Sequence, residues 1–110
     1  MKLLLEAGAE IDASNREGFT ALNLAAYAGH LQAVQILLER GANITTKNKI
    51  GNTALLSATE KSYTDIVRVL LEHGAELNTK NEEGRSALMI AIRKRNSDVV
   101  KLLKHAGAKE

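Results

Sequence analysis

Apolar residues along the chain follow the spacing of amphipathic helices, in short segments separated by glycine. Within residues 20–28, Leu22, Ala25 and Ala26 lie at positions i, i+3 and i+4, which predicts a helix with one buried stripe. Residues 31–40 continue the pattern with larger side chains. The positions expected to be buried there are Leu31, Val34, Leu37 and Leu38. The pattern therefore predicts two consecutive short helices.

Polar residues and glycines mark where these helices begin and end. Thr20 is placed to cap the first helix, because its hydroxyl can accept a hydrogen bond from an exposed backbone N–H group. Gly41 supplies the left-handed residue that ends the second helix. Residues 15–18, Asn-Arg-Glu-Gly, are typical of a turn, and residues 42–47 should extend into a hairpin finger that leads to the next turn.

The same two-part pattern recurs at a fixed spacing of 33 residues. The first part, Gly-Phe-Thr-Ala-Leu in its first copy, begins at Gly18, Gly51 and Gly84. The second part, Leu-Leu-Glu-Ala-Gly-Ala in its first copy, occupies residues 4–9, 37–42 and 70–75. A fixed period of this size indicates stacked supersecondary units. The units are residues 1–14, 15–47, 48–80 and 81–110.

This unit resembles the ankyrin repeat, a 33-residue β-turn and helix pair built around Thr-Pro-Leu-His-x-Ala. Residues 18–31 and 36–44 are similar to that family almost position by position. The chain departs from it at two places in every copy. Alanine replaces the usual proline at Ala21, Ala54 and Ala87, and the usual histidine is replaced by Asn23, Leu56 and Met89. The resemblance covers essentially the whole chain and implies an all-α solenoid with short β-hairpin or turn fingers, forming a single domain over residues 1–110.

The two ends of the array are expected to differ. The chain begins partway through a second helix, so Leu3 and Leu4 should pack on the next repeat with nothing covering their other side. In the last unit, residues 90–92 (Ile-Ala-Ile) are expected to enlarge the inner face of the first helix. Lys104 stands where earlier units have leucine, which places charge where a further repeat would dock. The last unit therefore resembles an ankyrin C-terminal cap.

The turn between the two helices is expected to vary along the array. Gly29 ends the first helix of one unit, but Ser62 and Arg95 occupy the aligned positions in the next two. A residue other than glycine in a left-handed conformation costs about 1 kcal/mol. We therefore expect the two later turns to be less stable or differently bent.

Composition narrows the classes of function. The 110 residues carry a net charge of +2, so no strong field favours nucleic acid or a membrane surface as a partner. There is no cysteine, and therefore no disulfide framework, thiolate metal site or thiol nucleophile. No apolar stretch approaches the length of a membrane span. We expect an intracellular, cytoplasmic protein.

No residue pattern predicts catalysis, a cofactor or a metal site. The glycines do not form a phosphate-binding loop, and His30, His73 and His105 lie in different units without ligand spacing. Glu39 and Glu72 share one repeating position, which is typical of a solvated face. Asn78 lies at a hairpin position that can be hydroxylated in ankyrin proteins, but a structural role in the hairpin is favoured. We expect no enzyme.

The resemblance implies a binding surface, because ankyrin proteins generally hold partners on a concave face made of turn tips and exposed first-helix positions. By alignment these positions are Arg16, Glu17, Phe19, Tyr27, Lys49, Ile50, Asn52, Glu60, Lys61, Glu82, Glu83, Arg85, Arg93 and Lys94. They vary between units while core positions stay nearly constant, which is typical of a binding surface and also of unconstrained surface drift.

The expected function is a non-catalytic protein-protein interaction module. Exposed apolar groups on a rigid face are good anchors, so Phe19, Tyr27 and Ile50 are the expected apolar contacts. The expected charged selectors are Arg85, Arg93 and Lys94. The partner is another protein or peptide, and the chain itself is expected to be a monomer.

The alternative belongs to a different class: a structural, trimmed or engineered scaffold without a native ligand. It would self-associate end to end through Leu3 and Leu4. The start within a repeat and the absence of proline motivate this alternative.

Overall fold

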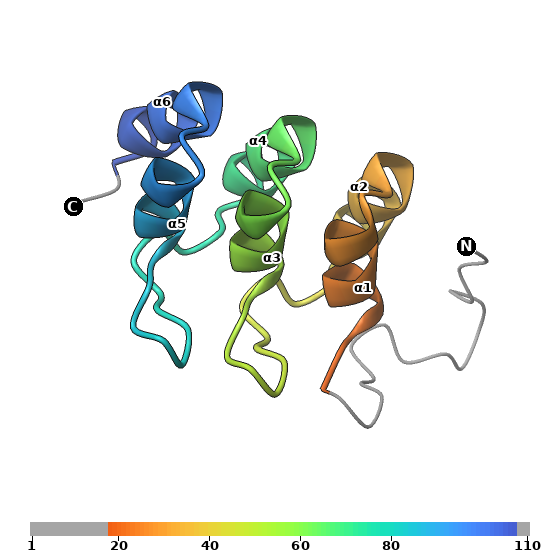
Figure 1. The fold of residues 1–110 in the computed structure, drawn as a ribbon. Helices are drawn as coiled ribbons and strands as arrows, with labels where there is room; N and C mark the ends of the chain where they lie inside the picture. Colours follow the sequence, from red (N-terminus) through yellow and green to blue (C-terminus); the bar gives the residue numbers. More distant parts are fainter. Residues whose placement is uncertain (1–17, 108–110) are drawn as a thin grey trace.

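The computed structural model describes residues 18–107 and consists of three helix pairs stacked in a row (Figure 1). The helices are α1 (Ala21–Ala28), α2 (Leu31–Glu39), α3 (Ala54–Glu60), α4 (Thr64–Glu72), α5 (Ala87–Arg93) and α6 (Ser97–His105). Helices α1, α3 and α5 form one layer, and α2, α4 and α6 form the other. The stack measures 41 × 24 × 20 Å. The predicted all-α solenoid is confirmed.

Each helix of the first layer begins at a hydroxyl cap, as predicted for Thr20. The Oγ1 atom of Thr20 accepts from the N–H group of Asn23 at 3.2 Å, and Thr53 accepts from Leu56 at 3.3 Å. Ser86 caps α5 in the same way. These bonds satisfy backbone donors that have no partner inside the helix, so the first-layer helices start at equivalent places.

The turns between paired helices share one conformation despite their different residues. Gly29, Ser62 and Arg95 all have a left-handed backbone, with φ of 80°, 61° and 55°. In each turn the next N–H group donates to the carbonyl five residues earlier, as His30 does to Ala25 at 2.9 Å. The expectation of differently bent later turns is therefore wrong, because the backbone hydrogen bonds hold the same geometry around a serine or an arginine.

The fingers that link successive pairs are turns, and residues 18–107 contain no β-strand. The backbone N–H group of Asn48 donates to Asn52 and that of Asn81 donates to Arg85, each at 3.0 Å, which closes a hairpin-like loop. The Asn48 Oδ1 atom accepts from the N–H groups of Ile50 and Asn52, both at 3.0 Å. The predicted fingers are thus present as side-chain-braced turns.

One continuous apolar core runs between the two layers. Its repeated positions are leucines that are almost fully buried: Leu22, Leu55 and Leu88 in the first layer, and Leu37, Leu70 and Leu103 in the second. Leu31, which was expected to be buried, is half-buried and lies in the first turn of its helix.

One prediction about the core of the final helix pair is wrong. Ile92 was expected to enlarge the inner face of its helix, but it is 48% exposed. Its aligned residues Ala26 and Thr59 are buried. Since α1 packs on α3 and α3 on α5, the first two of these positions are covered by a following helix pair, and within residues 18–107 no pair follows α5. Leu3 and Leu4 lie outside the described residues.

Candidate partner-binding surface

The stacking of α1, α3 and α5 places residues 33 positions apart in rows across the first layer. One row lies directly before the N-caps and consists of Phe19, Asn52 and Arg85. A second row lies in the last helical turns and consists of Tyr27, Glu60 and Arg93. Both rows begin with an aromatic residue, pass through a polar or acidic one and end with arginine. We call the surface that carries these rows the concave face.

Aromatic rings meet over α1 at one end of the concave face. The ring centroids of Phe19 and Tyr27 are 6.2 Å apart with an interplanar angle of 64°, an edge-to-face arrangement. The Nζ atom of Lys61 lies 4.6 Å from the centroid of the Tyr27 ring, so its ammonium group is attracted by the π-system. Tyr27 remains 47% exposed. These three residues form the aromatic end of the surface.

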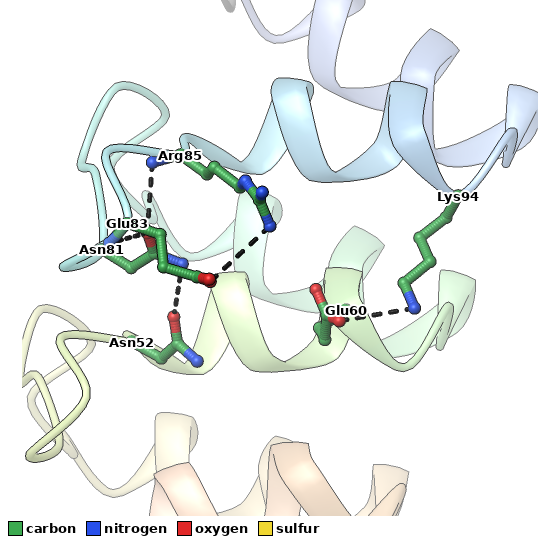
Figure 2. A network of polar contacts seen from close by, with 6 residues as sticks. All are labelled: Asn52, Glu60, Asn81, Glu83, Arg85 and Lys94. Atoms are coloured by element: carbon green, nitrogen blue, oxygen red, sulfur yellow. Dashed lines mark hydrogen bonds and ion pairs between the residues drawn. The ribbon is translucent and has the colours of Figure 1, made fainter.

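A pocket of about 130 Å³ lies at the opposite end, between α3 and α5. Its lining residues are Glu60, Arg85, Ile90, Arg93 and Lys94, and we call it the basic pocket. The Lys94 Nζ atom lies 3.3 Å from a carboxylate oxygen of Glu60, which links the two helices (Figure 2). Buried Ile90 supplies an apolar wall. The pocket thus combines three cations with one carboxylate.

Arg85 is held from its backbone outward. Its N–H group donates to the Oδ1 atom of Asn81 at 3.1 Å, and the Nδ2 atom of Asn81 donates to the Oδ1 atom of Asn52 at 3.2 Å (Figure 2). The Arg85 guanidinium group lies 3.6 Å from a carboxylate oxygen of Glu83. This chain of contacts joins two neighbouring fingers and fixes where the arginine side chain starts.

The aligned asparagine of the preceding finger makes no equivalent bridge. Asn48 braces its own finger, but its Nδ2 atom is buried without a hydrogen-bond partner in the described part of the chain. Phe19 occupies the position aligned with Asn52 and has no side-chain acceptor to offer. The junction with the aromatic end therefore lacks the polar link found at the basic pocket.

The structure gathers most of the predicted site residues into these two groups. The aromatic end contains Phe19, Tyr27 and Lys61, and the basic pocket with its bracing contacts contains Asn52, Glu60, Glu83, Arg85, Arg93 and Lys94. Exposed finger-tip residues Lys49, Ile50 and Glu82 belong to neither group. Arg16 and Glu17 lie outside the described residues.

The sequence did not predict two features of the structure. Ile90 lines the basic pocket, although the pattern had assigned it to the helix's inner face alone. A second pocket, of about 200 Å³, lies where the α1–α2 turn meets α4 and includes Gly29, Tyr63 and Ile66 in its lining. Both features depend on contacts between neighbouring units, and the only sequence signal for them is the unit-to-unit alignment.

Neither metal-site nor membrane-span geometry was found in residues 18–107. His, Asp and Glu side chains do not gather there in groups of three that could hold a metal ion. No helix within that range has the length and apolar character needed to cross a membrane.

Stacked helix pairs with in-register rows on one face define a helical repeat protein. Two family models identify the family. The model for ankyrin repeats in three copies matches residues 46–110, and the model for ankyrin repeats in many copies matches residues 4–55. The chain belongs to the ankyrin repeat family. A search of curated proteins finds no match to it.

Proposed function

We propose that this protein is a non-catalytic interaction module that holds a protein or peptide partner on its concave face. Ankyrin repeats are generally protein-protein interaction modules. The observation that carries the proposal for this chain is the pair of rows in which equivalent positions change from aromatic to arginine. The leucines beneath stay constant, so the surface varies on a constant backbone.

The concave face is preorganised for binding. The concave face rests on buried leucines, capped helices and braced turns, so binding orders few additional groups and loses little conformational entropy. Contacts with Phe19 and Lys61 hold the Tyr27 ring in place. Because the residue is still half-exposed, part of its apolar ring surface is available to a partner. Aromatic and arginine side chains on a rigid surface are the residue types that dominate binding energy in protein interfaces.

The test is selection of binders followed by matched substitutions. A displayed library of peptides and small domains is panned against the protein, and the affinities of selected binders are measured for the parent and for the Phe19→Ala/Tyr27→Ala variant. We expect binding to weaken by roughly tenfold or more, as for loss of an interface hot spot. Circular dichroism should show that the variant remains folded.

The control changes two exposed residues of α2, Gln32→Ala and Gln35→Ala, which lie in the other helix layer. This variant should bind as the parent does. Equal affinity for the aromatic variant, or a comparable loss in the α2 variant, would show that the concave face is not the binding surface.

A further inference from the structure

The two ends of the concave face carry different chemistry, and the basic pocket holds more positive than negative charge. Lys94 is paired with Glu60 at 3.3 Å and Arg85 with Glu83 at 3.6 Å. Arg93 makes no ion pair with any residue between 18 and 107, although it lines the same pocket. One guanidinium group is therefore left without a protein carboxylate in a recess with a buried isoleucine wall.

Resting on the proposed function, we propose that the partner is an extended acidic peptide segment whose carboxylate enters the basic pocket. An apolar side chain of the same segment lies on the aromatic end. A carboxylate matches the pocket because arginine presents a planar fork of donors to its two oxygens. Charge complementarity thus selects the acidic group, and the exposed Tyr27 ring selects the apolar one.

The spacing between the two anchors follows from the packing of the first layer. Neighbouring packed helices lie about 8–10 Å apart, so Tyr27 on α1 and Arg93 on α5, two helices further along the layer, are separated by roughly 20 Å. An extended chain advances about 3.3 Å per residue, which places the acidic residue roughly six positions from the apolar one. The path crosses α3 before it reaches Arg93, and Glu60, on the α3 side of the basic pocket, would repel a second carboxylate there. The partner segment should therefore be neutral in its middle.

A synthetic probe tests this arrangement directly. The probe is a fluorescein-labelled peptide with Phe-Leu at one end, five Ser or Gly residues in the middle and Glu-Glu at the other end. A second probe carries the reverse order, because the chain direction is open, and a third has the same composition scrambled. Fluorescence anisotropy should show that one ordered probe binds several times more tightly than the scrambled peptide, with binding that weakens as salt rises.

Three substitutions are expected to weaken, to strengthen and to leave unchanged the binding of the ordered probe. Arg93→Ala should weaken binding of the ordered probe by roughly tenfold, the scale of a lost charge-assisted hydrogen bond. Glu60→Gln should tighten it, because Lys94 then loses its competing carboxylate and the path over α3 loses its repulsion. Lys101→Ala on α6 removes one exposed cation away from the concave face and should leave the affinity unchanged.

Several outcomes would overturn the proposal: equal binding of ordered and scrambled probes, an equal loss in the Arg93→Ala and Lys101→Ala variants, or weaker binding after Glu60→Gln. Tighter binding of a single-stranded oligonucleotide than of the ordered probe would also overturn it. Library-selected binders that depend on Tyr27 but ignore Arg93 and Glu60 would leave the proposed function standing while this inference fails. Selected binders whose affinity depends on none of Tyr27, Arg93 and Glu60 would overturn both the proposed function and this inference.

Discussion

The two junctions between helix pairs have the same backbone but different side-chain chemistry. At the first junction, between α1–α2 and α3–α4, the Tyr63 ring packs against the turn at Gly29, where an added Cβ would lie 2.9 Å from the ring's Cζ atom. At the second junction, between α3–α4 and α5–α6, the aligned residues are Asn96 and Ser62. The turn accepts serine there with the same left-handed backbone.

The fingers and the concave face follow the same division. The first junction has the contact of the Lys61 ammonium group with the Tyr27 ring, and a buried Asn48 amide that lacks a hydrogen-bond partner in the described residues. The second has the Asn81–Asn52 hydrogen bond and the Lys94–Glu60 ion pair between units. The repeated core therefore sets the stacking of the helix pairs, while the surface side chains at each junction can differ in polarity.

The largest expected effect comes from adding a methyl group at the first junction. Gly29→Ala should lower the free energy of unfolding by about 2–3 kcal/mol, because a left-handed alanine is strained and its Cβ collides with the Tyr63 ring. Urea denaturation followed by circular dichroism measures the change. Gly41→Ala is the matched control, since that glycine is also left-handed but has nothing within 4 Å of an added Cβ. Equal losses in the two variants would refute a specific role for the Tyr63 contact.

A smaller effect is expected from cutting the polar link at the second junction. Asn52→Ala removes the acceptor of the Asn81 Nδ2 donor and should cost about 1 kcal/mol of unfolding free energy. Asn52→Asp keeps an acceptor at this position and should remain close to the parent. If denaturant titrations find both variants equally stable, the side-chain bridge between the fingers contributes nothing.

The smallest effect is a gain in stability at the second junction. Ser62→Gly relieves the left-handed strain, partly offset by the greater freedom of glycine in the unfolded chain, and should add about 0.5–1 kcal/mol. Thermal and urea unfolding of the parent and variant would measure it. A loss of stability would mean that the serine contributes interactions that outweigh its backbone strain.

Much of the fold was predictable because its determinants are local. The 33-residue spacing, the hydroxyl caps at Thr20 and Thr53 and the glycine at position 41 each act within one helix pair, so they are visible in a single stretch of sequence. The buried leucines follow from helical periodicity in the same way. Ile92 was misplaced because its exposure depends on whether a further helix pair covers it, which periodicity within α5 does not determine.

The candidate site was predictable as a set of positions but not as a set of contacts. Alignment at 33 residues places Glu60 opposite Arg93, yet its carboxylate pairs with Lys94, one residue further on. That choice depends on side-chain reach across the gap between α3 and α5. The hydrogen bond from Asn81 to Asn52 likewise requires two fingers to lie side by side, so the sequence around either asparagine alone does not predict it.

The serial stacking of α1 on α3 and α3 on α5 makes the concave face act as a ruler. Inserting one more 33-residue unit between the aromatic end and the basic pocket would move them apart by one interhelical spacing, about 10 Å. An extended ligand would match that change with about three additional residues. Duplication of a repeat within such an array would therefore change the length of peptide that fits between the aromatic end and the basic pocket, without a change in the residues of either.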